Sequence, residues 1–528
     1  MPLRFGENME KLLEKIITQE CEKLITRHYE YLFDLNENIR RKEKRLDSII
    51  SKEVKFPYYW NIDEGFNPFK VNSKKRIEIY AYTLSKKIKE NSYQPKTSII
   101  HRIDKPSGGY RDLNIFQIPD SAISNFVYKS VLAKNLTLLS NYAYAYREDR
   151  NAHDAILRIS SDWNTVDRIF VAEFDFSKFF DKISHDYLLG ILNNRNFLLT
   201  DLERFLISQF LHSSAIDASN YDSEKGKIRT QGIPQGTSIS LFLANIACWE
   251  LDQEFENIGV KFARYADDTI IWSNSYEKVI RSYDAIDHFG KLMGVPINHK
   301  KSEGISVISE EKEEIRSKPS IKYLGYALSL RNISIGEKSI HNIKKKISYI
   351  IYSNLLQPLI HGIYNDKRIT NFDWDYITTL AQLRRYMYGG LDDTKLKKFR
   401  FGEIKSLHFR GVMSYFPIVN DERQLKGLDG WLINSLKQTL RKRKSLFLAK
   451  GISYPEPISN WIENISEFTS WQSQSSKPIY DLRIPSFLFI NKAMQKGLKS
   501  NGLKSITNPK SIYYSGSFRK ISSSSNRI

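Results

Sequence analysis

The sequence contains little cysteine and no long apolar run, and each absence excludes a class of protein. Cys21 and Cys248 are its only cysteines, too few and too far apart for a disulfide framework or a zinc cluster, so we expect a reducing compartment. The longest apolar stretch, 239–249, is shorter than the ~18 residues that a membrane-spanning helix needs. The first residues also lack the apolar core of a secretory signal. We therefore expect a cytoplasmic protein without a membrane partner.

Negative charge is scarce relative to positive charge. The 528 residues include 80 Lys and Arg against 60 Asp and Glu, a formal charge of +20, in an otherwise ordinary composition for a folded protein. Such an excess predicts a polyanionic partner, most often nucleic acid and less often an anionic membrane surface. No acid follows Asp481, whereas nine Lys or Arg do. We therefore predict a basic C-terminal region over 451–528, with a partly disordered tail that contacts polyanion.

Two segments are predicted to form β-hairpins. The first covers 98–118, with its turn at 106–109. In the second, the strands 261–265 and 269–272 are joined through Ala266, Asp267 and Asp268. Tight hairpin turns usually carry Gly or Asn at the tip, so two adjacent acids there require a functional explanation.

A third acid, Asp175, ends the apolar strand predicted over 168–174. If it converges with Asp267 and Asp268, the three carboxylates form an oxygen-only ligand set, which suits Mg²⁺ and not Zn²⁺. Two such ions can activate a terminal hydroxyl and stabilise a leaving pyrophosphate. Each acid taken alone is as readily a solvated turn residue.

Three segments in order closely resemble motifs A, B and C of reverse transcriptases. They read FDFSKFFD at 174–181, QGIPQG at 231–236 and YADD at 265–268. The segment 144–155 resembles the block between fingers and palm in the group II intron and retron branches. The segments 294–302 and 323–326 resemble motif D and the motif E primer grip.

The resemblance implies a right-hand polymerase of the α+β class, with fingers, a palm whose antiparallel sheet carries the catalytic carboxylates, and a helical thumb. The predicted domains are an N-terminal helical extension at 1–55, fingers and palm at 56–335, the helical thumb at 336–450 and the basic C-terminal region at 451–528.

The resemblance also assigns roles to individual residues. It implies that Asp175, Asp267 and Asp268 are catalytic and hold two Mg²⁺ ions, or Mn²⁺ in their place, with the backbone carbonyl of Phe176 as an added ligand. For nucleotide binding it implies Lys105, Arg111, Phe180, Gln235, Gly236 and Lys301, or Lys300 if the register shifts by one. For the primer it implies Tyr323, Leu324 and Gly325. The basic cluster Lys437, Arg441, Lys442, Arg443 and Lys444 would contact template–primer phosphates, as in the thumb of group II intron maturases.

Three of these residues carry specific expectations. A ring as large as that of Phe180 would block a ribose 2′-hydroxyl, which implies that the substrates are dNTPs. Gly236 would permit close approach of the backbone to the nucleotide, and Lys301 would donate a proton to pyrophosphate. Taken alone, Phe180 is an ordinary core residue, Lys301 is a solvated charge, and the basic cluster belongs to a solvated helix pair.

No nuclease cluster follows the predicted thumb, which disfavours mobility by DNA cleavage. A reverse transcriptase with a long N-terminal extension and a basic C-terminal region resembles the bacterial defence-associated, "unknown group" enzymes. That resemblance implies an RNA-directed DNA polymerase that makes cDNA from an associated noncoding RNA in antiphage defence. The alternatives are a retron or intron-derived enzyme with another role, and a non-catalytic RNA-binding scaffold. Three mutually repelling carboxylates argue against the scaffold.

Two uses of the C-terminal region compete. Its charge favours binding of a structured RNA, whereas apolar residues at 487–490 favour assembly of a homo-oligomer. A third hypothesis is that Tyr513 or Tyr514 primes DNA synthesis covalently, although Tyr is abundant throughout the chain.

Overall fold

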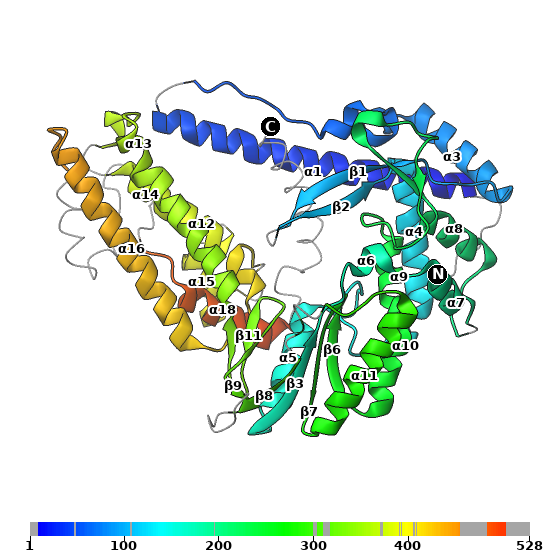
Figure 1. Ribbon diagram of the computed structural model, residues 1–528. Coiled ribbons are helices and arrows are strands. Elements are labelled where there is room, and N and C mark those ends of the chain that lie inside the picture. Colours follow the sequence, from blue (N-terminus) through cyan, green and yellow to red (C-terminus); the bar gives the residue numbers. More distant parts are fainter. Residues whose placement is uncertain are drawn as a thin grey trace.

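The computed structural model has the right-hand polymerase architecture of the α+β class, as the sequence predicted (Figure 1). It describes residues 9–46, 49–105, 108–194, 196–298, 302, 304–309, 317–369, 373–389, 391, 393–404, 407, 409–454 and 483–502. The expectations for Lys300, Lys301, Tyr513, Tyr514 and the C-terminal tail lie outside these residues. Within the described part of the chain, no helix is both long and apolar enough to cross a membrane.

The palm is built on a five-stranded sheet with the order β6-β7-β3-β8-β9. Its strands are β3 (Arg168–Phe174), β6 (Lys261–Tyr265), β7 (Asp268–Ser273), β8 (Gly304–Ser309) and β9 (Ser317–Lys318). The central strand β3 pairs antiparallel with β7 and β8, and β8 pairs parallel with β9. The hairpin predicted around the paired acids is confirmed as β6 and β7.

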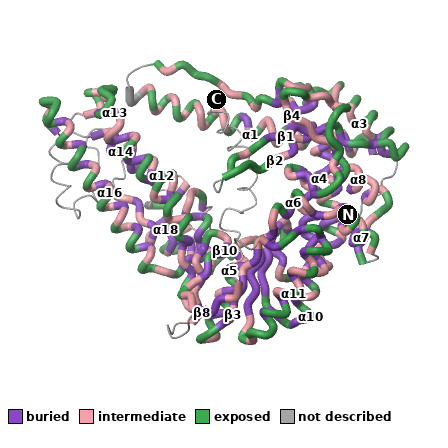
Figure 2. Tube along the Cα trace, viewed as in Figure 1, coloured by how far each residue is buried: buried purple, intermediate pink, exposed green. Residues whose placement is uncertain are grey.

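Alternation along β3 divides the palm core into two layers. Ala172 and Phe174 pack into one apolar cluster with the palm helices, whereas Ile169 and Val171 pack on the opposite face with the thumb. The helices of the first layer are α6 (Phe179–Lys182), α7 (His185–Asn193), α9 (Ile239–Ala247), α10 (Trp249–Ile258) and α11 (Tyr276–Met293), while α5 (Ala152–Trp163) covers the second face. Figure 2 shows buried residues concentrated along the strands of this sheet. The sheet is therefore held rigidly from both sides.

The fingers contain a four-stranded sheet with the order β2-β1-β4-β5. Its strands are β1 (Ser98–Asp104), β2 (Tyr110–Ile115), β4 (Ser214–Asp217) and β5 (Lys227–Ile228). The neighbouring helices are α1 (Met9–Leu46), α2 (Pro68–Val71), α3 (Lys74–Lys89), α4 (Ile118–Asn135) and α8 (Asp201–Leu211), with short 3-10 helices at Tyr58–Asn61, Glu64–Phe66, Leu136–Leu138 and Ala218–Asn220. The first predicted hairpin is confirmed as β1 and β2.

Helix α1 packs on the fingers through its N-terminal half. Ile17 and Cys21 are fully buried in a cluster with Val71, Ile77 and residues of α4. Beyond His28 the described side chains of α1 are half-buried or exposed, and the helix runs across the top of the view from the fingers toward the thumb (Figure 1). The first half of the predicted N-terminal extension is thus part of the fingers core.

A three-stranded meander, at the end of the segment predicted as fingers and palm, leads into the helical bundle predicted as the thumb. The strands are β10 (Ile321–Tyr323), β11 (Tyr326–Leu328) and β12 (Ile333–Ile335). The helices are α12 (Glu337–Leu355), α13 (Gln357–Ile360), α14 (Trp374–Tyr388), α15 (Asp393–Phe401), α16 (Glu422–Leu448) and α18 (Phe487–Asn501), with 3-10 turns at Asp366–Arg368 and Val412–Tyr415. In α16 a leucine recurs every three or four residues on the buried face, which explains why this helix joins the bundle core.

Helix α18, from the predicted C-terminal region, packs on the helical bundle. Asp429 of α16 accepts hydrogen bonds from the Ser486 hydroxyl and the Phe487 amide, both at 2.6 Å, and so fixes the start of α18 to α16. Phe487 and Ile490 are buried in the same core as the thumb. Leu488 and Phe489 are half-buried, and homo-oligomer assembly through this segment stays a prediction.

Candidate active site

The strand register brings the three predicted catalytic acids to one end of the palm sheet. Phe174 of β3 lies opposite Thr269 of β7 in the antiparallel ladder. Asp175 and Asp268 are the next residues outward on these two strands, so their backbones are neighbours at the sheet edge. Asp175 is half-buried and Asp268 is exposed. The sequence predicted this convergence, and the sheet topology supplies its physical cause.

Asp267 lies in the turn that joins β6 to β7. Tyr265 pairs with Asp268, which leaves Ala266 and Asp267 as a two-residue turn. Ala266 has a φ of 62°, a left-handed conformation that is uncommon for a residue other than glycine. Backbone strain of this kind persists only where the surroundings enforce it, and it is concentrated at functional sites.

The ligand chemistry at this edge suits a hard divalent cation. Carboxylate oxygens are the ligands that Mg²⁺ prefers. The three acids occupy neighbouring backbone positions at the end of β3, at the start of β7 and in the turn between β6 and β7. Among the described residues, however, no three His, Cys, Asp or Glu side chains are grouped closely enough to hold a metal ion. The backbone register brings the acids to one edge of the sheet, and metal binding there stays a proposal.

Asn298 contacts Asp175 and was not singled out from the sequence. Its side-chain amide donates to Asp175 Oδ2 at 3.1 Å, and its backbone amide donates to the Asp175 carbonyl at 2.8 Å. The preceding residue, Ile297, forms an antiparallel β-bridge with Phe176. The segment resembling motif D thus lies along the chain just after β3. The only sequence feature that could have indicated this contact was the short amide side chain within that segment.

A buried ion pair supports the turn from inside the palm. Arg264, fully buried one residue before the YADD segment, binds both carboxylate oxygens of Asp252 at 2.7 and 2.5 Å. The same guanidinium donates to the Ala266 carbonyl at 3.1 Å and to Asn245 Oδ1 at 3.3 Å. Such a fully bonded network fixes the turn geometry, since Arg264 links the strained Ala266 to α9 and α10.

Tyr323 has a different environment from the one expected of a primer contact. Its side chain is buried, and its hydroxyl donates to the carbonyls of Ala263 at 3.0 Å and Asp268 at 3.2 Å. Burial, with the nearby Asp268 carboxylate, raises the pKa of Tyr323 far above its usual range. Tyr323 therefore ties the β10–β11 hairpin to the catalytic strands. Leu324 and Gly325, with φ values of 48° and 85°, form the tip, where Gly325 is exposed.

The residues predicted to bind the nucleotide come from the fingers hairpin and from motifs A and B. Lys105 and Arg111 lie at the hairpin tip, where Arg111 is exposed. Phe180 is half-buried, and its carbonyl accepts a 2.7 Å hydrogen bond from Ile233, which joins motif A to motif B. Gln235 donates to Asp181 Oδ1 at 2.9 Å.

Gly236 packs closely against the protein backbone. A Cβ placed on it would lie 2.3 Å from the Asn114 carbonyl oxygen of β2. The Asn114 amide also donates to the Gln235 carbonyl at 2.6 Å. The glycine thus lets motif B pack directly on the fingers strand, a role that the sequence did not reveal.

The basic cluster on α16 does not act as one surface. Arg441 and Lys442 are exposed and Lys437 and Lys444 are half-buried, but Arg443 is fully buried. Helical periodicity explains the difference, because Arg443 shares the buried face with Leu436, Leu440 and Phe447.

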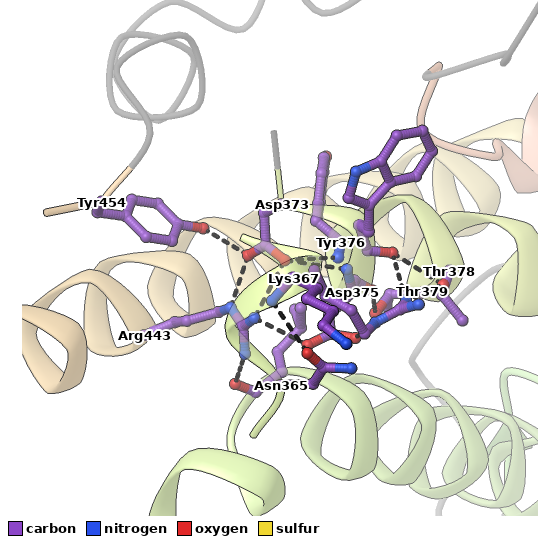
Figure 3. A network of polar contacts seen from close by, with 12 residues as sticks. Asn365, Lys367, Asp373, Asp375, Tyr376, Thr378, Thr379, Arg443 and Tyr454 are labelled. Carbon is purple, nitrogen blue, oxygen red and sulfur yellow. Dashed lines mark hydrogen bonds and ion pairs between the residues drawn. The ribbon is translucent and has the colours of Figure 1, made fainter. Parts of the chain in front are cut away.

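Figure 3 shows how the charge of Arg443 is balanced. Its guanidinium binds Asp373 at 2.6 and 3.0 Å and Asp375 at 3.0 Å, and Tyr454 donates to Asp373 at 2.9 Å. Arg443 is therefore a structural residue of the thumb, and its burial contradicts the predicted contact with nucleic acid.

Comparison with known proteins shows what the central part of the chain is similar to. Residues 103–328 match the family described as "Reverse transcriptase (RNA-dependent DNA polymerase)". The chain is 24% identical over 283 residues to the group II intron-encoded protein LtrA of Lactococcus lactis subsp. cremoris. This alignment covers 52% of this chain and 45% of that protein. The chain is also 30% identical over 122 residues to the retron Ec86 reverse transcriptase of Escherichia coli. That alignment covers 22% of this chain and 35% of the retron protein.

The comparisons also returned a yeast relative and one solved structure. The putative COX1/OXI3 intron 2 protein of Saccharomyces cerevisiae is 24% identical over 305 residues, 57% of this chain and 34% of that protein. A telomerase from Candida albicans in complex with a fragment of telomeric RNA aligns with a TM-score of 0.37 and 14% identity, over 73% of this chain and 70% of that one.

The right-hand fold and the match over residues 103–328 agree with each other. The chain contains a reverse transcriptase domain of the group II intron and retron-like type, as the sequence predicted. The chain spans about a third to a half of the length of the curated relatives named above.

Proposed function

We propose that this protein is an RNA-directed DNA polymerase that copies an associated noncoding RNA into cDNA in antiphage defence. The observation that carries the polymerase activity is the register of the palm sheet, which brings Asp175 and Asp268 side by side with Asp267 in the adjoining turn. The supporting features for a nucleic-acid substrate are the net charge of +20 and the basic residues of the fingers and thumb.

In this proposal Asp175, Asp267 and Asp268 hold two divalent ions, which when bound lower the barrier to attack of a primer hydroxyl on the nucleotide phosphate. Asn298 keeps the Asp175 carboxylate oriented through its 3.1 Å hydrogen bond. Lys105 and Arg111 bind the triphosphate, and Phe180 excludes a ribose 2′-hydroxyl. Arg441 and Lys442 bind backbone phosphates of the duplex, contacts that carry no sequence information.

The template is tested by synthesis on the RNA that co-purifies with the protein, with Mg²⁺ and labelled dNTPs. We expect labelled DNA that disappears after RNase pretreatment, and its sequence would identify the template. DNA that persists after RNase would contradict RNA templating and point to untemplated or protein-primed synthesis.

The defence role requires a separate test in cells. Phages should form fewer plaques on bacteria that carry the gene with its flanking sequence than on bacteria that carry the Asp267→Ala/Asp268→Ala form. The charge-matched control is Glu277→Ala/Asp284→Ala, two exposed acids of α11. Equal plaque numbers for the wild type and the catalytic variant, across a broad phage panel, would contradict a defence role that depends on synthesis.

A further inference from the structure

Arg229 is a half-buried cation whose Nε atom is buried without a hydrogen-bond partner among the described residues. It follows β5 and precedes motif B, and one terminal nitrogen donates to the Asn114 side-chain oxygen at 3.0 Å. A guanidinium has five N–H donors, and a buried donor without an acceptor costs stability. The Nε–H group therefore lacks an acceptor that a bound anion would supply.

The charge of Arg229 is also poorly balanced. Asp112 and Asp181 are the nearby acids, yet in the described part of the chain neither forms an ion pair with it. Asp112 faces Arg102 at 3.6 Å, and Asp181 accepts from Gln235 at 2.9 Å. Burial lowers the pKa of Arg229 in spite of both acids. The site thus favours an added negative charge.

The neighbours of Arg229 place it beside the residues assigned to nucleotide binding. Asn114, which accepts from Arg229, is three residues beyond Arg111 on β2 and also donates its backbone amide to the Gln235 carbonyl. Gln235 in turn bonds Asp181, the residue after Phe180. Arg229 therefore borders the junction of the fingers hairpin, motif A and motif B.

We propose that Arg229 binds a phosphate group in the active site, through the guanidinium donors that Asn114 leaves free. Guanidinium forms paired hydrogen bonds to phosphate oxygens, and the bound anion would satisfy the buried Nε and balance the charge. The phosphate belongs either to the incoming nucleotide or to the template strand. This proposal rests on the proposed function, because it places the phosphate within the polymerase site.

The test compares Arg229→Gln and Arg229→Lys with the wild type. Gln retains an amide that can donate to Asn114, and Lys retains the charge without the planar fork. Lys227→Gln is the matched control, since Lys227 is an exposed cation two residues away on β5. Three quantities are measured: KM for dNTP on a defined RNA template, Kd for that RNA without dNTP, and the rise in Tm caused by inorganic triphosphate.

If the phosphate is that of the nucleotide, Arg229→Gln raises the dNTP KM by about tenfold or more and abolishes the triphosphate-induced rise in Tm, with RNA affinity unchanged. If it is that of the template, Arg229→Gln weakens RNA binding and reduces the salt slope of log Kd by about 1, with KM unchanged. Either result requires a normal Tm for the unliganded variant and wild-type values for Lys227→Gln.

The proposal is overturned if KM, RNA affinity and the triphosphate effect all stay at wild-type values, or if only the Tm of the unliganded protein falls. It is also overturned if Lys227→Gln has the same effects, because a general loss of charge would then explain them. Failure of the wild type to polymerise would contradict the proposed function alone, since the RNA and triphosphate binding measurements do not need synthesis.

Discussion

At the scale of single residues, Asn298 is the side chain whose effect on catalysis can be isolated most cleanly. It donates to the Asp175 carboxylate at 3.1 Å from a loop, so its removal should not disturb a core. A hydrogen bond to a charged group contributes about 1.5–3 kcal/mol. We therefore expect Asn298→Ala to lower kcat by about 10- to 100-fold, with little change in dNTP KM or Tm.

This prediction is checked by steady-state kinetics on a primed RNA template. Asn342→Ala, which removes an exposed amide from α12, is the control and should behave as the wild type. Equal kcat values for Asn298→Ala and wild type would show that Asp175 does not depend on Asn298 for its orientation.

At the scale of elements, the start of helix α4 contains a buried acid that makes stability depend on pH. Asp120 accepts from the Tyr93 hydroxyl at 2.8 Å and from the Lys96 amide at 3.1 Å. Burial raises the pKa of Asp120 from 3.8 to about 6. The folded chain therefore retains this proton to higher pH than the unfolded chain, and the free energy of unfolding falls as the pH rises through that window.

Between pH 4.5 and 7.5 the contribution of this carboxyl to stability should fall by about 2 kcal/mol. Asp120→Asn cannot ionise, so the stability of the wild type relative to this variant should decrease by that amount over the same interval. Urea unfolding at the two pH values measures the difference. A difference that stays constant with pH would mean that the Asp120 carboxyl is not buried as described.

The thumb helices are held together by the buried charges around Arg443. Replacement by methionine leaves Asp373 and Asp375 without their common partner, and loss of one member of a buried ion pair typically costs about 3–5 kcal/mol. We expect Arg443→Met to destabilise the thumb strongly. Arg441→Met, two residues away and exposed, should leave Tm unchanged and weaken binding to nucleic acid.

Thermal unfolding and RNA binding of the two variants separate these roles. If Arg443→Met kept its Tm and lost RNA affinity in the same way as Arg441→Met, Arg443 would be a nucleic-acid contact after all.

The sequence predicted those elements whose signal is local. Both hairpins were predicted from alternating residues and turn chemistry. The acids at the palm edge were singled out because Asp267 and Asp268 occupy a hairpin turn that usually carries glycine or asparagine. The bond from Asn298 to Asp175 spans 123 positions, so no local pattern reveals it. The burial of Arg443 was missed for another reason. A run of alternating Arg and Lys suggests a solvent-exposed surface, but on a helix that packs in a bundle one position of each turn faces the core.

At the scale of the whole molecule, the two cysteines report on separate parts of the architecture. Cys21 lies between α1 and the fingers helices, whereas Cys248 lies in the palm core. Burial raises the pKa of each thiol to about 12. Because the thiolate is the reactive form, we expect neither cysteine to react with a thiol reagent at pH 8 in the native protein, and both to react after unfolding.

Pulsed labelling across a urea series measures whether α1 unfolds with the fingers. Coincident exposure of Cys21 and Cys248 would indicate one cooperative unit that includes α1. Exposure of Cys21 at much lower urea would support a separate N-terminal extension, as the sequence suggested.

The central claim is that the end of the palm sheet is a polymerase site formed by Asp175, Asp267 and Asp268. The most direct test is extension of a DNA primer on a defined RNA template with Mg²⁺ and dNTPs, by the wild type, Asp267→Ala/Asp268→Ala and Glu277→Ala/Asp284→Ala. We predict extension by the wild type and by the α11 control, and none by the catalytic variant. Extension by the catalytic variant, or no extension by any folded form on either an RNA or a DNA template, would contradict the claim.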